Sequence, residues 1–426
     1  MIHRIGLLIA ALLLTAGSFA ASIKTDRTWY LAGEAMQVSV GTDGALIAYA
    51  ELCDKYNMAA GVVIGLEGGK GTGTIELPSD LHSGYYMLSV YTRDNPNVSR
   101  RLVAVVNPLH RSEDDDIEWV KIMDDDSLSY SSTGGGERLS MEEMAVTKPV
   151  DIRETEGHII KARVRNVYDG TTYLRHQINP SLSIVGKQVH YFEGKMVNDS
   201  TAVFFTHGLH GKQPLVLSAA SYNGVSLPIE MISPFAALLP KQLPHLVFHY
   251  KRSEVEARSL DMQRHQIAIA PAKRELQIGD YADDTAEDGV PLDYDETVNG
   301  TKPDLSYNLD EYRQFLTIKE VLIEYVHLVR RVKINGAPQL VVRKDGAAYD
   351  GKWPAMVLID GMPVIDIERL LNYDARRIHY INIYANQYTF GNYVYNGILS
   401  FITRSGRLTN YPVEPNVQYL VYEFPE

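Results

Sequence analysis

The sequence has 426 residues, of which 45% are hydrophobic and 22% are charged, as in ordinary globular domains with packed cores. At roughly 150 residues per domain, this length predicts two to four domains. The formal net charge of −12 at pH 7 argues against a nucleic-acid-binding protein, which needs a basic surface.

Residues 1–20 predict a secretory signal peptide rather than folded structure. Arg4 supplies a short basic start, residues 6–16 form an apolar run, and Ser18-Phe19-Ala20 has the spacing of a cleavage site. Beyond it, no stretch reaches the roughly 18 apolar residues that a membrane helix needs. We therefore expect an exported protein without a membrane span of its own. Loss of Arg4 with this segment takes the net charge from −12 to −13.

Residues 22–108 predict the first β-sandwich. Val38 and Val40 alternate with polar residues, a period of two that indicates a strand with one buried face. The glycine-rich stretch 65–73 predicts a hairpin, because its Lys70 is followed by glycine and not by the Ser or Thr of a phosphate-binding loop.

The same segment resembles a macroglobulin-type β-sandwich. The residues that carry the resemblance are Trp29–Glu34, Ala50–Leu52, Leu77–Leu81, Ser83–Leu88 and Tyr91–Arg93. Macroglobulins that trap proteases use a thioester between a cysteine and a glutamine, but Cys53 has no glutamine motif after it. The resemblance therefore implies the scaffold and not the trapping chemistry. As the only cysteine, Cys53 also has no disulfide partner in the chain, so we expect a buried thiol.

Two acidic segments, 109–150 and 271–305, predict linkers, since they carry too few apolar residues to form a core. In the first, the spacing of the carboxylates fits no calcium-binding loop. The second has eight carboxylates between residues 280 and 296. We expect it to be a solvated tether, or alternatively a docking segment for a basic partner.

Residues 151–270 predict a second β-sandwich followed by a connector. Strand patterns alternate with turn signals such as Tyr168-Asp169-Gly170. The strands are expected at residues 159–164, 182–185, 203–206 and 215–218. His207 and His210 would share a face only on a helix, which the neighbouring glycines disfavour, so a polar hairpin tip is expected here and not a metal site.

Residues 306–426 predict a small α+β module. Thr317 and Glu320 have the spacing of a capping box, in which each side chain accepts a hydrogen bond from the other residue's backbone N–H. An apolar strand at 355–359 then leads to an Asp-Gly turn. A short helix at 367–371 and strands at 377–385 and 398–403 complete the pattern.

This module resembles the plug domain of TonB-dependent outer-membrane receptors across about 50 residues. The matching pattern is an apolar strand, an Asp-Gly-x-Pro turn, a helix, and two strands joined by a glycine-containing loop. The residues expected to serve structure or interaction are Asp360, Gly361, Pro363, Tyr388, Gly391, Asn396, Gly397 and Thr403. Only 23 residues follow Thr403, too few for a transmembrane β-barrel, so the resemblance implies a plug-like domain without its own barrel.

The fold class expected is therefore mainly β, with two Ig-like β-sandwich domains followed by a small α+β plug-like domain. The combination implies a protein of the Gram-negative periplasm or outer-membrane surface. Its plug-like domain would dock to or gate an outer-membrane pore or transport complex, with the sandwiches as spacers or binding arms. The alternatives are an adhesion or carbohydrate-binding protein, and a hydrolase with paired carboxylates.

An enzyme is not expected. The sequence lacks the Gly-x-Ser-x-Gly of a nucleophile elbow, the His-Glu-x-x-His of a zinc protease and a phosphate-binding loop. We accordingly name no catalytic residue, no cofactor and no metal ligand. The partner, the ligand and the oligomeric state are left open.

Overall fold

The computed structural model describes residues 21–122, 144–186, 189–222, 224–275, 297–334, 336–343, 353–390, 393–406, 408, 411 and 414–425. It confirms the mainly β fold class with sandwich domains. The chain divides into two compact units, one of residues 1–153 with 237–258 and one of residues 154–236 with 259–426. Within the described ranges, no helix combines the length and apolarity that crossing a membrane requires.

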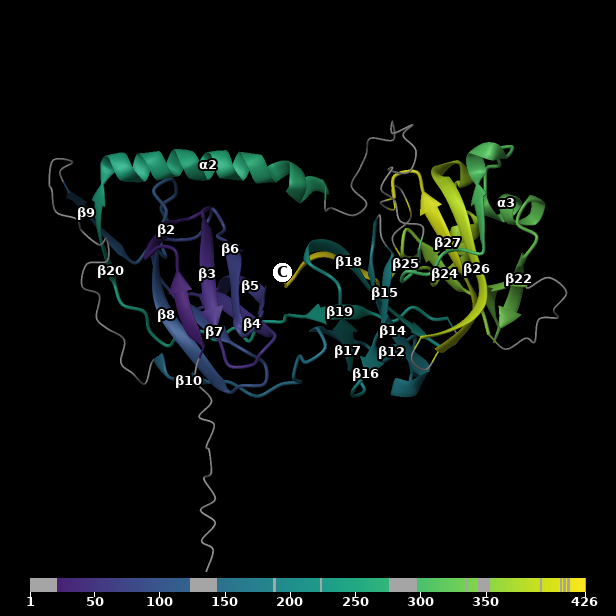
Figure 1. Ribbon diagram of the computed structural model, residues 1–426, viewed down its shortest axis with the longest axis horizontal. Coiled ribbons are helices and arrows are strands. Elements are labelled where there is room, and N and C mark those ends of the chain that lie inside the picture. The colour runs from purple at the N-terminus through teal and green to yellow at the C-terminus, as the bar shows by residue number, and fades with distance from the viewer. Residues whose placement is uncertain are drawn as a thin grey trace, which may run out of the picture. The chain divides into compact units, whose positions relative to one another are not determined.

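The first unit contains a β-sandwich (Figure 1). One sheet has the order β1-β3-β6, and the other has the order β10-β8-β7-β4-β5 with β2 parallel to β8. The strands are β1 (Ser22–Thr25), β2 (Trp29–Leu31), β3 (Ala35–Gly41), β4 (Ile47–Cys53), β5 (Met58–Gly65), β6 (Lys70–Glu76), β7 (Gly84–Tyr91), β8 (Asn97–Val106) and β10 (Val146–Thr147). Val38 and Val40 point into the core between the sheets, as their alternation predicts, and Cys53 is buried.

Two later segments also belong to the first unit. Strand β9 (Ile117–Ile122) lies within the segment predicted as a linker, and it pairs in parallel with β20 (Leu246–Lys251). The edge of Trp119 packs against the ring of Phe248, with centroids 5.4 Å apart. Packing of the partly buried Trp119 on the buried Phe248 orders a stretch whose many carboxylates suggested a tether. Helix α2 (Arg252–Glu275) begins directly after β20, and its residues up to Arg258 belong to this unit.

The second unit begins with the second sandwich. Its sheets have the orders β16-β17-β11-β19 and β15-β14-β18-β28, and a separate hairpin joins β12 to β13. The elements are β11 (His158–Val164), β12 (Val167–Tyr168), β13 (Thr171–Thr172), η1 (Arg175–Gln177), β14 (Ile178–Ile184), β15 (His190–Glu193), β16 (Lys195–Met196), β17 (Thr201–Thr206), β18 (Gly211–Ser221) and β19 (Ile229–Ile232). As predicted, His207 and His210 lie in the turn between β17 and β18.

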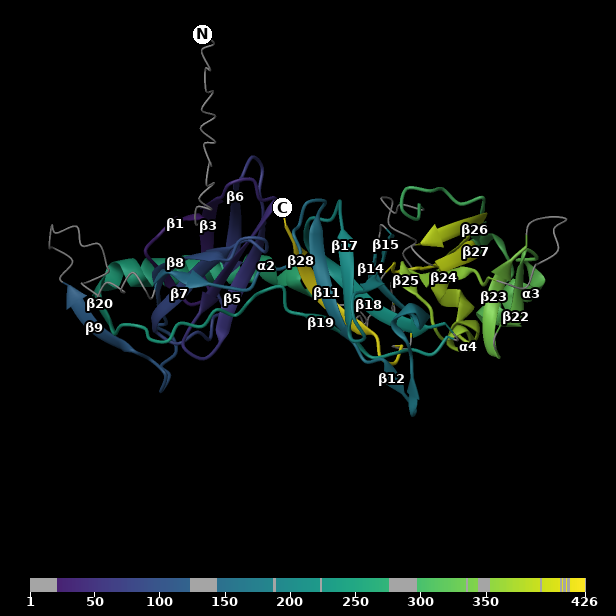
Figure 2. The same ribbon diagram turned by 90° about the horizontal axis from the view of Figure 1, so that it is seen from below.

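The last strand of the chain completes this sandwich. Strand β28 (Gln418–Phe424) pairs antiparallel with β18 over seven residues, from Gly211 opposite Phe424 to Leu217 opposite Gln418. Figure 2 shows this strand beside the second sandwich, although it follows the α+β module in the sequence. Tyr422 and Phe424 are buried in the sandwich core. The segment predicted as 306–426 thus supplies one strand to the domain predicted as 151–270.

The α+β module has the sheet order β21-β26-β27-β24-β25 and a separate hairpin of β22 with β23. Its elements are β21 (Leu305–Asn308), η2 (Leu309–Glu311), α3 (Ile318–Glu324), β22 (Val329–Ile334), β23 (Ala337–Val342), β24 (Met356–Ile359), β25 (Met362–Pro363), α4 (Ile367–Leu371), η3 (Ala375–Arg377), β26 (Ile378–Phe390) and β27 (Tyr393–Thr403). The capping box of Thr317 and Glu320 is present at the start of α3.

Both faces of this sheet are buried. Val357 and Ile359 of β24 pack with α3 and α4 on one face, whereas Met356 and Leu358 pack with Tyr191 of the second sandwich on the other. A strand buried on both faces is apolar at consecutive positions, which explains the unbroken apolar run at 355–359. The second sandwich and the α+β module therefore share buried surface within one unit.

Candidate functional site

The Asp360-Gly361 turn lies at the centre of the α+β module. It joins β24 to β25 with positive φ angles of 46° and 88°. Two such residues in succession make the tight turn that suits antiparallel strands, and Asp-Gly is a favoured pair for it. A Cβ atom at Gly361 would lie 2.9 Å from the backbone oxygen of Ile184. Glycine therefore lets the turn approach the second sandwich.

The carboxylate of Asp360 is fully buried and accepts three hydrogen bonds. The donors are the backbone N–H of Thr403 at 2.8 Å, the hydroxyl of Thr403 at 2.5 Å and the backbone N–H of Leu408 at 2.8 Å. Burial raises the pKa of this carboxyl, while the hydrogen bonds from Thr403 and Leu408 lower it. The backbone oxygen of Asp360 also accepts a hydrogen bond from the N–H of Gly186 at 3.3 Å. The side chain thus fastens the turn to the end of β27.

The other motif residues surround the same sheet. Gly397 has a φ of 98°, and a Cβ there would lie 2.7 Å from the side chain of Val342. The backbone N–H of Asn396 donates to the oxygen of Pro354, and Pro363 pairs with Leu358 in the β24–β25 hairpin. Tyr388 is half-buried beside the cluster that contains Tyr191. Gly391 lies outside the described residues.

The structure therefore brings Asp360, Gly361 and Thr403 together, and it places Asn396 and Gly397 further along the strand β27 that ends at Thr403. All of these contacts are internal to the second unit, and the carboxylate has no exposed surface. Geometry of this kind holds a fold in place; it does not present a group to a ligand.

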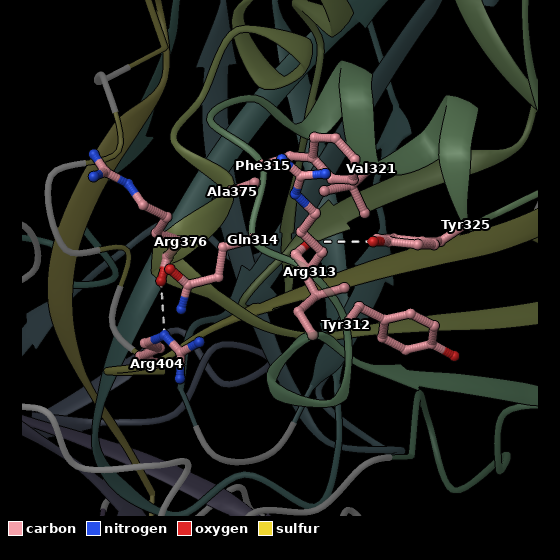
Figure 3. A pocket seen from close by; sticks show the side chains of 10 residues that line it. Tyr312, Arg313, Gln314, Phe315, Val321, Tyr325, Ala375, Arg376 and Arg404 are labelled. Atoms are coloured by element: carbon pink, nitrogen blue, oxygen red, sulfur yellow. Dashed lines mark hydrogen bonds between the residues drawn. The ribbon is translucent and has the colours of Figure 1, made fainter.

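An exposed basin lies on the same module, beside α3. Figure 3 shows it between the ring of Tyr325 on one side and Arg376 and Arg404 on the other. Its lining residues are Leu309, Tyr312, Arg313, Gln314, Phe315, Val321, Tyr325, Ala375, Arg376 and Arg404. We call it the arginine–aromatic basin. Its free volume is about 10 Å³, which is room for one water molecule. The basin is consequently too small to enclose a metabolite.

Aromatic rings form one wall of the basin. Tyr325 packs against Tyr312 with centroids 4.6 Å apart and against Phe315 with centroids 5.5 Å apart. Its hydroxyl donates to the backbone oxygen of Arg313 at 3.3 Å. On the same segment, Leu316 and Ile323 are also exposed, at 65% and 63%.

Arginines form the other wall. Arg404 donates to both carboxylate oxygens of Asp310, at 2.5 and 3.2 Å, and this pairing lowers the pKa of Asp310. Arg376 binds Asp374 in the same bidentate way, at 2.9 and 2.7 Å. The exposed side chain of Arg313 has no ion-pair partner among the described residues. Of the three arginines, Arg313 is therefore the one that is available to a carboxylate of a partner.

No pattern in the sequence indicates this basin. Arg376 and Arg404 are neighbours because β26 pairs with β27. Nε of Arg404 donates a hydrogen bond to the backbone oxygen of Arg376 at 2.7 Å. Tyr325 is the C-cap residue of α3, which ends at Glu324. In the structure its ring lies among the basin's aromatic side chains.

Buried charges in the first unit are satisfied by their own chain. Glu34 accepts hydrogen bonds from Arg258, whose guanidinium lies 3.6 Å from the ring centroid of Trp29. Glu51 accepts from the hydroxyl of Tyr91 and from the backbone N–H of Ala237. These contacts attach the returning segment 237–258 to the first sandwich. Across the described part of the chain, no three His, Cys, Asp or Glu side chains are grouped as metal ligands would be.

Comparisons with known proteins found partial structural matches at low identity. No protein-family model matches it, and neither does any curated protein sequence. The native conformation of the E. coli alpha-2-macroglobulin is 14% identical, with 52% of this chain and 14% of that chain covered and a TM-score of 0.19. The Ig1-2 module of the Drosophila receptor protein tyrosine phosphatase DLAR is 6% identical, with 55% and 100% covered and a TM-score of 0.16.

Human protocadherin-24 EC1-2 is 11% identical, with 55% of this chain and 99% of that chain covered and a TM-score of 0.16. The chain spans only 14% of the length of the E. coli macroglobulin chain. Since all three TM-scores are below 0.5, the sandwich assignment rests on the strand registers described above.

Proposed function

We propose that this protein is a non-enzymatic docking protein of the cell envelope. In this proposal, the α+β module binds an outer-membrane pore or transport complex, and the two sandwiches act as spacers or binding arms. The proposal is supported by the resemblance of residues 357–403 to a receptor plug and by the signal-peptide pattern of residues 1–20. β-Sandwich domains of the kind found here are compatible with a binding or spacer role.

The observation that carries the proposal is the arginine–aromatic basin. Its shallow form suits a protein surface better than a small substrate, because a metabolite site needs a volume of roughly 300 Å³ or more. Its Arg and Tyr side chains are the types that contribute most to binding energy in protein interfaces. A partner with exposed carboxylates beside an apolar side chain would complement both walls.

Crosslinking in intact envelopes of the native host tests this function. The full-length protein should be recovered with an integral outer-membrane protein that mass spectrometry identifies. The Arg313→Glu and Arg376→Glu double variant should lose at least about 90% of this product, since the charge of the basin is reversed. A single charge reversal in the first sandwich, Lys70→Glu, should leave the yield unchanged, because Lys70 is exposed and distant in sequence from the basin.

Recovery of no outer-membrane protein, or equal recovery with all three proteins, would contradict the proposal. A soluble periplasmic partner that is lost in the double variant would keep the basin as the docking site but exclude an outer-membrane role.

A further inference from the structure

A groove of about 280 Å³ lies in the second unit where the second sandwich meets the α+β module. Tyr168 of β12 and residues 224–226 line it from the sandwich. Residues 337–339, 365–367 and 414–416 line it from the remaining sides. Boundaries between domains are common positions for ligand sites, and this volume is close to the lower end of the range for small ligands.

One carboxyl in this groove has an unused oxygen. Glu414 is 1% exposed, and its Oε1 accepts the hydroxyl of Tyr411 at 3.3 Å. Its Oε2 has no hydrogen-bond partner among the described residues. Burial raises the pKa of Glu414, while the charge of Arg369 and a hydrogen bond from the backbone of Asp366 oppose that shift. A buried polar oxygen without a partner costs about 1–3 kcal/mol, so a ligand that donates a hydrogen bond here is favoured.

The backbone around Glu414 is held in place. The hydroxyl of Ser226 donates to the oxygen of Pro415 at 2.7 Å, and the amide of Asn416 donates to the oxygen of Ser226 at 2.9 Å. These two hydrogen bonds occupy polar groups on one wall of the groove. The side chain of Gln339 lines another wall. The groove is therefore pre-formed, which lowers the entropy cost of binding.

Tyr168 supplies an aromatic surface at the edge of the groove. It is 44% exposed, and it is carried on a tight hairpin whose turn residues, Asp169 and Gly170, have φ angles of 48° and 71°. An exposed tyrosine on a short rigid hairpin loses little conformational freedom when a ligand stacks on its ring.

From this arrangement we propose that the groove binds a short neutral saccharide. Sugar hydroxyl and acetamido groups donate to Glu414 Oε2 and exchange hydrogen bonds with Gln339, while the apolar face of a sugar ring stacks on Tyr168. An apolar ligand would leave Oε2 unsatisfied. The charges of Arg369 and Asp366 act on this carboxyl in opposite directions and pair with each other at 3.7 Å, so they do not favour an ionic ligand. A metal ion is disfavoured because the described residues include no group of three suitable ligands.

Titration calorimetry with the purified full-length protein tests the site, with tri-N-acetylchitotriose and maltotriose as probes. We expect saturable binding of at least one probe with one site per chain. Tyr168→Ala and Glu414→Gln should each weaken it about tenfold or more. Tyr168→Phe keeps the ring and should bind as well as wild type. Control variants Tyr56→Ala and Glu423→Gln, at exposed or partly exposed positions outside the groove, should leave binding unchanged.

Absence of saturable binding for both probes overturns the proposal, and so does binding that survives Tyr168→Ala. Tyr168 is exposed, so weaker binding by Tyr168→Ala is not explained by misfolding. Glu414 is buried, so Glu414→Gln must also show the same thermal unfolding curve as wild type. The site is independent of the proposed docking function, since the calorimetry uses no partner and the variants leave the arginine–aromatic basin intact.

Discussion

The Asp360-Gly361 turn and the arginine–aromatic basin lie in the same α+β module but differ in exposure and in the partners of their charges. The turn is fully buried, and its carboxylate is saturated by three donors from its own chain. The basin is exposed, and Arg313 has no ion-pair partner among the described residues. In this module, the part with the most recognisable sequence pattern therefore holds the fold, whereas the part suited to binding has no such pattern.

The sharpest test of this comparison is Asp360→Ala. It leaves three buried donors without an acceptor and puts alanine at a φ of 46°, so we expect the unfolding free energy of the second unit to fall by about 3 kcal/mol or more. Denaturant titration and amide exchange at Thr403 and Leu408 would measure the loss. Asp304→Ala, which removes one exposed side-chain acceptor, is the control. Equal effects of the two would contradict a special role for Asp360.

Gly397→Ala should have the next largest effect. Its Cβ would lie 2.7 Å from the side chain of Val342 at a φ of 98°, and we expect a loss of about 2 kcal/mol. Gly170→Ala is a matched control, because Gly170 also has a positive φ, 71°, but faces open space. Thermal unfolding of both variants separates the backbone strain from the clash. A smaller loss at Gly397 than at Gly170 would show that Val342 moves aside at little cost.

The arginines of the basin should have unequal structural roles. Arg404→Ala removes a bidentate partner of Asp310 and is expected to cost about 1 kcal/mol. Arg313→Ala should change the unfolding free energy by less than about 0.5 kcal/mol, since the side chain is exposed. Both values can be taken from denaturant titration. A large cost at Arg313 would mean that this residue supports the fold and is not available to a partner.

The smallest expected effect is the pH dependence due to Glu414. Burial raises its pKa in the folded protein, so its contribution to stability is greatest below the unfolded glutamate pKa of about 4.3 and is lost as pH rises through the folded value. Unfolding free energies measured from pH 4 upward should therefore fall less steeply in Glu414→Gln than in wild type. Identical slopes would indicate that a hydrogen-bond donor already stabilises the ionised carboxylate.

Local patterns in the sequence predicted most of the individual elements. Alternation at Val38 and Val40, the capping box at Thr317 and the Asp360-Gly361 turn each involve residues close together in the chain, and all three are present. The pairing of β28 with β18 and of β9 with β20 joins residues more than 100 positions apart. The periodicity within a strand does not specify such a partner, because any strand with a suitable pattern of apolar and polar residues could pair with the same sheet edge.

The candidate sites show the same limit. Glu414, Tyr168 and Gln339 belong to one groove only because three distant segments converge, and the arginines of the basin converge through a strand pair. The residues that a resemblance can identify are those under backbone or core constraint, such as Gly361 and Gly397. Side chains that line a surface site between distant segments are brought together by the tertiary structure, so their spacing in the sequence follows no fixed pattern.

The return of β28 to the second sandwich has a consequence for how the chain folds. The sheet that begins at Ile178 cannot be completed until Gln418–Phe424 is available, a separation of more than 200 residues, and the α+β module lies between them. The segment between β9 and β20 likewise encloses most of the second sandwich. Contacts of such high sequence separation slow folding, because the long intervening loop must close first. The second sandwich is therefore expected to mature late, once the whole chain has been synthesised, whereas both sheets of the first sandwich can form from strands within residues 22–147.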